Sequence, residues 1–148
     1  MIEMKLDLSK FTKSLDSLSK GSQQEAKKAI AKVSYKVEGD CKDNISSGSR
    51  SGRIYKRGKT RTHQASAAGE FPKTDYGDLV KNIKAEFNFS GFESTVGSRL
   101  SAPHGFWLEF GTPKMKPRPW LSRTINENKK FIKKTFDDAL SNIAKDFK

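Results

Sequence analysis

Two long stretches of the chain repeat apolar residues every three or four positions, which is the period of an amphipathic helix. The first runs from about Ser9 to Asn44, and the second begins at Pro119 and continues to the C-terminus. We therefore expect a long N-terminal helix over residues 9–44 and a long C-terminal helix. Gly21 costs about 1 kcal/mol relative to alanine inside a helix, so we expect the first helix to kink or divide there.

Shorter patterns lie between these stretches. Residues 74–83 place Leu79 and Ile83 four apart, behind a candidate cap at Thr74 or Asp75, which predicts a short helix. The sequence KAEFNFS then alternates apolar and polar residues, which predicts a strand with one buried face. The turn signal SGFE and the sequence STVGS complete a hairpin. The sequence HGFWLEFG, closed by Gly111, predicts one or two helical turns, with a strand as the alternative.

These patterns predict an α+β fold with long N- and C-terminal helices packed on a small antiparallel β-sheet. The length of 148 residues fits a single domain spanning residues 1–148. Residues 75–148 supply the short helix, the hairpin, a second short helix and the C-terminal helix. Only 34% of the residues are hydrophobic, and a core of that size is often supplemented by oligomerisation.

A long basic loop interrupts the predicted elements at residues 46–74. It is rich in glycine and serine, and Glu70 is its only acidic residue. The cations that we select as candidate contacts are Arg50, Arg53, Lys56, Arg57, Lys59 and Arg61. The formal net charge of +12 implies attraction to polyanions. We expect this loop to be mobile in the free subunit and to become ordered against a partner.

The residue types argue against several classes of protein. Cys41 is the only cysteine, and no group of cysteines and histidines has zinc-ligand spacing, so we expect no disulfide, metal or cofactor and a reducing cytoplasm as the place of synthesis. Charges interrupt the N-terminal residues, and no apolar run approaches a membrane span. His63 and His104 belong to no catalytic motif. We expect a protein that is not an enzyme, and a hydrolase would require a pocket around one of these histidines.

The segment from Ala102 to Leu121 concentrates aromatic residues and prolines. Prolines fix φ and restrict the preceding residue, so the sequence GTPKMKPRP predicts a stiff extended arm that is suited to docking on another surface. We expect Trp107 to pack under the terminal helix and Trp120 to point outward from the arm. The candidate interface residues are Glu109, Phe110, Gly111, Thr112, Pro117, Arg118, Pro119 and Trp120. In the alternative, Gly111 merely ends a helix and Glu109 is solvated.

Two blocks of sequence, in this order, resemble the small neck proteins of tailed bacteriophages, which are called tail-completion, head-tail joining or minor tail proteins. The first block is ASAAGEFPKTDYGDLVKNI, and the second is PHGFWLEFGTPKMKPRPWL, which precedes the terminal helix. The resemblance covers approximately Gly52 to the C-terminus. The chain departs from the family pattern at Tyr76, Lys81, Asn82 and Trp120.

The resemblance implies a non-enzymatic structural protein of the virion neck, made in the host cytoplasm. Copies would form a homo-oligomeric ring that joins the portal connector of the head to the tail. Its neighbours would be the head-connector proteins and the tail-tube or tail-terminator proteins, and the DNA that passes through the channel would make non-specific contacts. We expect no membrane partner. The alternative function is a basic nucleic-acid-binding module, which the net charge favours.

Overall fold

The computed structural model describes residues 2–5, 20–99 and 102–145. In chain order the elements are β1 (Ile2–Lys5), α2 (Lys20–Ser47), β2 (Ile54–Arg57), β3 (Arg61–Gln64), α3 (Asp78–Asn82), β4 (Ile83–Asn88), β5 (Glu93–Ser98), α4 (His104–Phe110) and α5 (Leu121–Lys145). The predicted start of the N-terminal helix near Ser9 falls outside the described residues.

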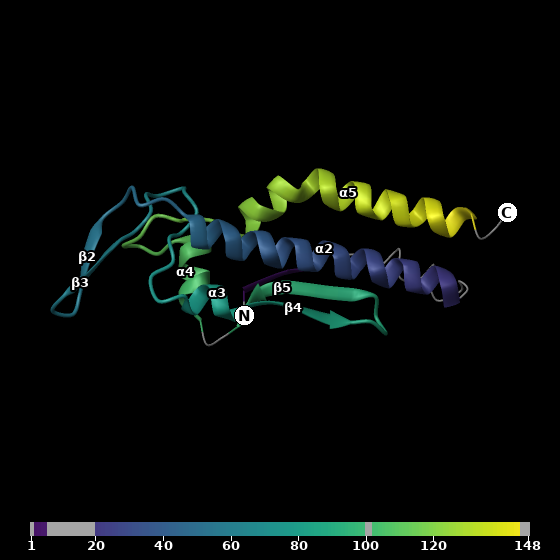
Figure 1. The fold of residues 1–148 in the computed structure, drawn as a ribbon, viewed down its shortest axis with the longest axis horizontal. Coiled ribbons are helices and arrows are strands. Elements are labelled where there is room, and N and C mark those ends of the chain that lie inside the picture. The colour runs from purple at the N-terminus through teal and green to yellow at the C-terminus, as the bar shows by residue number, and fades with distance from the viewer. Residues whose placement is uncertain (1, 6–19, 100–101, 146–148) are drawn as a thin grey trace.

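The two long helices run antiparallel along the length of an elongated molecule (Figure 1). Helix α2 lies between α5 and the β4–β5 strands, so one helix contacts both of the other layers. Strands β1, β5 and β4 form an antiparallel sheet in that order. The α+β fold that the periodicity predicts is therefore confirmed.

Helix α2 follows its apolar period closely. Its buried positions include Ala26, Ile30, Val33, Val37 and Cys41, which recur at three- and four-residue steps. The helix continues beyond the predicted end at Asn44 to Ser47. Gly21 lies in the first turn of the described helix, and the kink or division that we expect there stays a prediction because the preceding residues 6–19 lie outside the described ranges.

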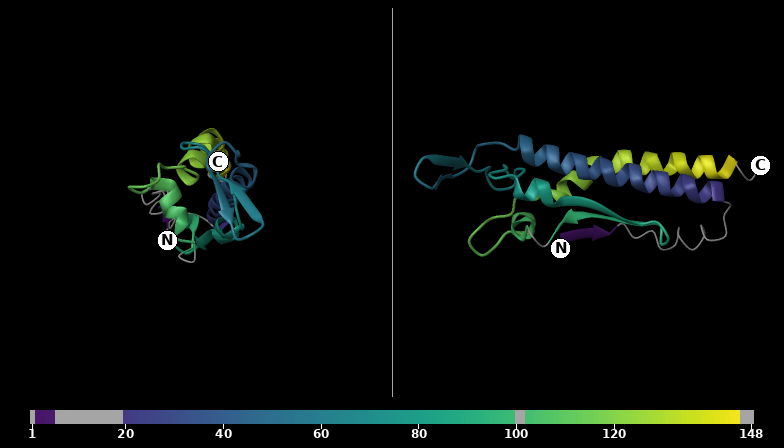
Figure 2. Two further views of the ribbon diagram at one scale, coloured as in Figure 1. Left: turned by 90° about the vertical axis from the view of Figure 1, so that its left-hand side faces the viewer. Right: turned by 60° about the horizontal axis from the view of Figure 1, so that its bottom comes forward.

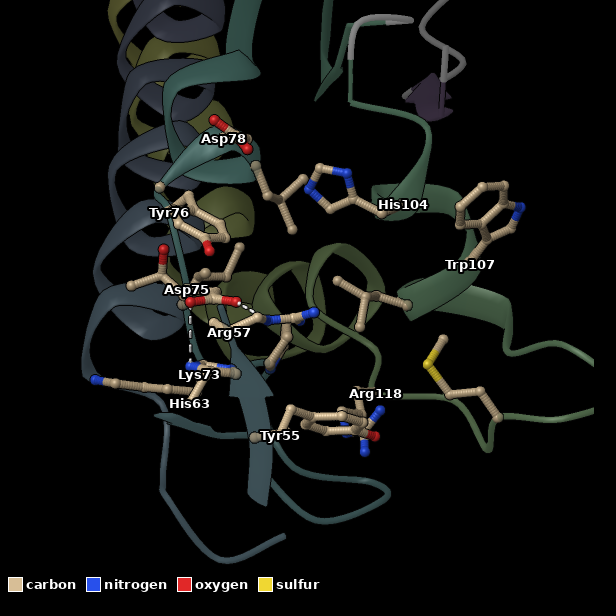
Figure 3. Close-up of a pocket in the computed structure, with 18 residues that line it drawn as sticks. Tyr55, Arg57, His63, Lys73, Asp75, Tyr76, Asp78, His104, Trp107 and Arg118 are labelled. Carbon is tan, nitrogen blue, oxygen red and sulfur yellow. Dashed lines mark hydrogen bonds and ion pairs between the residues drawn. The ribbon is translucent and has the colours of Figure 1, made fainter. Parts of the chain in front are cut away.

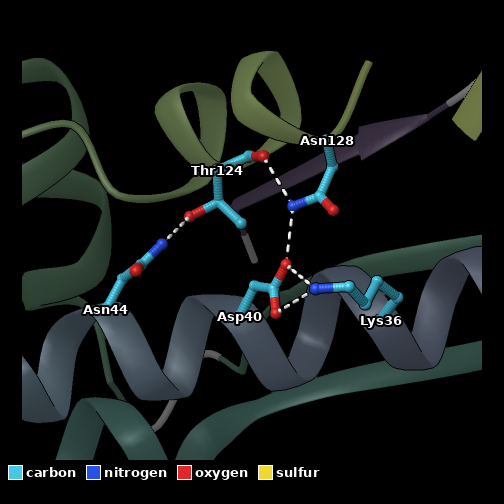
Figure 4. A network of polar contacts seen from close by, with 5 residues as sticks. All are labelled: Lys36, Asp40, Asn44, Thr124 and Asn128. Atoms are coloured by element: carbon cyan, nitrogen blue, oxygen red, sulfur yellow. Dashed lines mark hydrogen bonds and ion pairs between the residues drawn. The ribbon is translucent and has the colours of Figure 1, made fainter. Parts of the chain in front are cut away.

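The seam between α2 and α5 is partly polar (Figure 4). The Asn128 amide donates to Asp40 Oδ2 at 2.8 Å and to the Thr124 carbonyl at 3.0 Å. Asp40 also accepts from Lys36, while Asn44 Nδ2 donates to Thr124 Oγ1 at 3.2 Å. Buried polar groups are tolerated when they are paired, and this network pairs residues of one helix with specific residues of the other. It thereby fixes the register in which the helices pack.

The predicted hairpin is present as β4 and β5, whose register pairs Ala85 with Val96. Strand β1 pairs with the opposite side of β5 and was not predicted. The expected buried face of β4 is only partly closed, because Phe87 is half-buried and Phe89 is 42% exposed. The cap predicted for α3 at Thr74 or Asp75 was wrong: Gly77, with φ of 83°, occupies the N-cap position without a side-chain cap.

The basic loop is not structureless, which corrects the prediction for residues 46–74. Its first two residues still belong to α2, and strands β2 and β3 form a second antiparallel hairpin. This hairpin projects beyond the C-terminal end of α2, as Figure 1 and the right-hand view of Figure 2 show. The cross-strand pairs Tyr55–His63 and Arg57–Arg61 place one aromatic residue and several cations on it. The expected mobility of the free subunit stays a prediction.

Candidate protein interface

The two sequence blocks of the resemblance meet at one end of the molecule. Arg118 Nε donates to the Ser66 carbonyl at 2.9 Å, and the Gly69 amide donates to the Pro117 carbonyl at 2.9 Å. The guanidinium of Arg123 lies 4.3 Å from the centroid of the Phe71 ring. These contacts join residues that are about fifty positions apart in the sequence, so the two blocks form a single structural unit.

Glu109 links the short helix α4 to the long helix α5. Its Oε2 accepts the backbone N–H groups of Trp120 and Leu121 at 2.8 and 2.9 Å, and Oε1 accepts that of Ser122 at 3.0 Å. The first amides of a helix lack intrahelical partners and carry partial positive charge, and α5 has no acidic residue in its own first turn. Glu109 is only 6% exposed. It is a buried helix cap, and neither the interface residue that we expected nor the solvated carboxylate of the alternative.

The tryptophan assignments from the sequence were reversed. Trp120 is fully buried, and its indole N–H donates to the Gly105 carbonyl at 2.9 Å. Trp107 is 50% exposed. The rigid prolines before Trp120 therefore position a core residue at the start of α5.

Helix α4 presents an aromatic face to solvent. Its buried residues are Gly105 and Glu109, whereas Phe106, Trp107 and Phe110 are 52%, 50% and 63% exposed. The rings of Phe106 and Phe110 lie 4.9 Å apart, as expected for residues four positions apart on one helix face. We call these three residues the aromatic ridge. A clustered, exposed set of large aromatic residues is typical of a protein interface.

The predicted extended arm is instead a tight loop followed by an extended tail. Thr112 and Met115 form a two-way backbone bridge, with N–H to O distances of 2.8 and 3.1 Å. The backbone N–H of Arg118 donates a hydrogen bond to the Leu108 carbonyl at 2.7 Å. Of the predicted interface residues, Phe110, Thr112 and Pro117 are exposed, whereas Arg118 and Pro119 are half-buried. Only part of the predicted surface is thus available to a partner.

Gly111 ends α4 as predicted, with φ of 80° and ψ of −177°. This backbone conformation is essentially restricted to glycine, and an added Cβ would lie 2.8 Å from the Met115 carbonyl oxygen. We expect Gly111→Ala to lower the free energy of unfolding by about 1–3 kcal/mol, measured by urea denaturation. Gly39→Ala is the control, because a Cβ there meets nothing within 4 Å in α2 and should stabilise slightly. Equal stability of the Gly111 variant and the parent would contradict the assigned strain.

The basic hairpin is fastened to the body through Asp75. Arg57 Nε donates to Asp75 Oδ2 at 2.8 Å, and Arg61 Nη2 lies 2.6 Å from Oδ1. Arg57 and Arg61 are directly opposite each other across the two strands, where like charges repel, so a carboxylate between them relieves that repulsion. Burial raises the pKa of Asp75, but the Arg57 hydrogen bond and the nearby charges of His63 and Arg61 outweigh it and hold the pKa below its usual value.

Four other candidate cations of the hairpin region lie free of ion pairs in the described part of the chain. They are Arg50, Arg53, Lys56 and Lys59, all exposed. The Arg53 and Arg57 guanidinium groups flank the Tyr55 ring at 5.4 and 5.6 Å from its centroid. The residues predicted from charge therefore divide into two that hold the hairpin in place and four that face solvent.

A cavity of about 500 Å³ lies where the hairpin, α3, α4 and the 112–118 loop meet (Figure 3). Both histidines line it, and so do Tyr55, Arg57 and Trp107. The pocket that a hydrolase would require is therefore present. Within the described residues, however, neither histidine is hydrogen-bonded to a serine, threonine or cysteine side chain. Burial raises the pKa of the Cys41 thiol to about 12, so that group is not a thiolate nucleophile at neutral pH.

Sequence reasoning missed Asp75 and the cavity around it. The cavity-lining residues come from segments between Ile45 and Arg118, and no local pattern connects them. The aromatic ridge did leave a signal, since Phe106 and Phe110 are four apart and therefore share one face of the predicted helix. In residues 2–5, 20–99 and 102–145 no cluster of acidic, histidine or cysteine side chains has the composition of a metal site.

Comparison with protein-family models, with curated proteins and with solved structures returned no match. Among the helices of the described residues, none combines the length and the apolar character needed to cross a bilayer.

Proposed function

We propose that the chain is a structural protein of the neck of a tailed bacteriophage, where copies form a ring between the portal connector and the tail. The observation that carries this proposal is the outward-facing aromatic ridge of α4. A helix that turns glycine and glutamate inward and three aromatic rings outward gains nothing from that arrangement in an isolated subunit. A neighbouring subunit would bury the ridge.

The position of the ridge supports the same proposal. It belongs to the second sequence block of the resemblance, in which Arg118 and Pro117 contact the first block and the Arg118 N–H donates to the Leu108 carbonyl of α4. The ridge is therefore held by a packed framework before any partner arrives, which lowers the entropic cost of association. Ring subunits contact one another through two different surfaces, so the ridge would meet another face of the next copy.

A complementation experiment tests the proposal. In a phage that lacks the gene, Phe106→Ser combined with Phe110→Ser should reduce infectious particles at least tenfold, because truncation of interface anchors typically costs 2 kcal/mol or more. The purified variant should melt within a few degrees of the parent, since both side chains are exposed. Leu140→Ser, which removes a 45% exposed apolar residue from α5, is the matched control and should complement. Equal performance of the two variants would contradict a ring contact at the ridge.

A second candidate function is non-specific nucleic-acid binding, and the projecting hairpin favours it. Four exposed cations that form no ion pair with another described residue lie in or next to this hairpin, and each phosphate contact contributes to a salt-dependent affinity. Duplex DNA titrations of the isolated protein at several salt concentrations separate the two functions. Submicromolar affinity at physiological salt with a steep salt slope would make nucleic-acid binding the main function. Weak binding would leave the neck proposal in place.

A further inference from the structure

The cavity beneath the hairpin contains more hydrogen-bond donors than acceptors. The described side-chain hydrogen bonds of Arg57 and Arg118 use Nε alone, on Asp75 and on the Ser66 carbonyl. The remaining guanidinium N–H groups of both residues are left for a ligand. The ring of Trp107 also lines the cavity, with its indole nitrogen directed away from Arg57 and Arg118 (Figure 3).

The acidic side chains of the cavity are paired with cations or exposed. Asp75 Oδ2 accepts from Arg57, whereas Oδ1 lies 2.6 Å from Arg61 Nη2 in an ion pair without accepting a hydrogen bond, and His63 Nδ1 lies 3.6 Å from Oδ1. Asp78 lines the cavity but is exposed at the start of α3. Because the free groups are donors on cations, the ligand they match is an anion with several acceptor atoms, and guanidinium groups favour carboxylate or phosphate.

Apolar residues lie directly beside these cations. The cavity is also lined by Ile45, Pro72, Leu79, Leu108 and Met115. An inorganic ion would leave this apolar surface uncovered, whereas a volume of about 500 Å³ accommodates a few amino-acid residues. The combination suits a ligand that carries a carboxylate next to an aliphatic or aromatic side chain.

We propose that this cavity binds a short acidic peptide segment of a neighbouring protein, whose carboxylate contacts Arg57 and Arg118 and whose apolar side chain packs on Leu108 and Met115. The inference rests on the proposed function, because it names the chemistry of a neighbour in the neck. The net charge of +12 favours an acidic partner. The hairpin forms one wall of the cavity, so Asp75 keeps that wall in position.

The test uses the full-length protein and two fluorescein-labelled heptapeptides, one of alternating glutamate and leucine and one with glutamine in place of glutamate. Fluorescence anisotropy should show at least tenfold tighter binding of the acidic peptide. Arg118→Gln should weaken that binding at least tenfold, whereas Lys59→Gln, which removes the same charge at the hairpin tip, should change it less than threefold. Equal losses in the two variants, or equal affinity for the two peptides, would overturn the proposal.

A second variant covers the case in which Arg118→Gln fails to fold. Met115→Glu adds a carboxylate to the cavity lining without removing a described side-chain hydrogen bond, and it should abolish binding of the acidic peptide. Unchanged binding would place the peptide elsewhere. A seven-nucleotide single strand of thymidine is the competing probe. Tighter binding of this oligonucleotide, with the same loss in Met115→Glu, would replace the peptide site by a nucleotide site.

The ridge variants separate this inference from the proposed function. Phe106 and Phe110 do not line the cavity, so the double serine variant should bind the acidic peptide as the parent does. Peptide binding in a protein that fails to complement the phage would retain the cavity site and reject only the neck assignment. Complementation without any peptide binding would reject the cavity site alone.

Discussion

Trp120→Ala is expected to lower the free energy of unfolding by about 3–5 kcal/mol, the range for large aromatic truncations in a core. The side chain is fully buried, and it belongs to the main apolar cluster together with Leu121, Cys41 and Ile83. The substitution also removes the indole N–H from the Gly105 carbonyl, which leaves a buried acceptor without its partner. Chemical denaturation monitored by circular dichroism measures the loss.

The second tryptophan supplies the control for this prediction. Trp107→Ala should change the free energy of unfolding by about 1 kcal/mol or less, because half of the side chain is already exposed. It should instead affect assembly and binding at the end of the molecule where α4 lies. If Trp120→Ala melted like the parent while Trp107→Ala lost much of its stability, the burial of Trp120 and the exposure of Trp107 would both be contradicted.

Glu109→Gln is expected to cost about 2–4 kcal/mol of folding stability, because hydrogen bonds to a charged acceptor contribute about 1.5–3 kcal/mol. The carboxylate accepts three backbone N–H groups at the start of α5. A glutamine offers one acceptor oxygen, and its NH₂ group would face at least one of those donors. The loss of negative charge at a helix N-terminus adds to the effect. Urea denaturation at neutral pH measures it.

Glu127→Gln is the matched control for the same chemical change. Glu127 lies on the exposed side of α5 and pairs with Arg123 at 3.2 Å, one helical turn away. Such exposed pairs contribute about 0.5 kcal/mol or less. If the two glutamine variants lost equal stability, the capping role assigned to Glu109 would not hold.

The long helices and the β4–β5 hairpin could be predicted from the sequence because their apolar residues recur with a regular local period. The buried apolar residues of α2 occupy the positions that the helical period predicts to be apolar. Helix α5 begins two residues after Pro119, where the predicted C-terminal helix begins. Strand β1 was missed because four residues alternating with charges are too short to stand out. The β2–β3 hairpin was missed because its strands bury little, and its composition is that of a loop.

The tryptophans show why burial was harder to predict than helicity. The period of a short helix indicates which residues share a face, but it does not indicate which face meets the core. In α4 the close approach of Gly105 decides this, since a Cβ there would lie 2.6 Å from Ser98 Oγ. That contact depends on β5 and is not visible in the local sequence. The cavity has the same origin, because tertiary packing alone brings Arg57, His104 and Arg118 together.

The apolar residues that bury between α2 and its neighbours form two unequal clusters. The larger includes Val33, Ile45, Leu79 and Trp120, whereas the smaller, as far as the described residues extend, consists of Ala26, Ile30, Phe92 and Ile143 and lies toward the N-terminal end of α2. Amide groups exchange with solvent through local openings whose free energy depends on the packing that must be undone. The end with the smaller cluster should therefore open first. The end that carries the aromatic ridge would keep its shape during those openings, so it can meet a partner as a preformed surface.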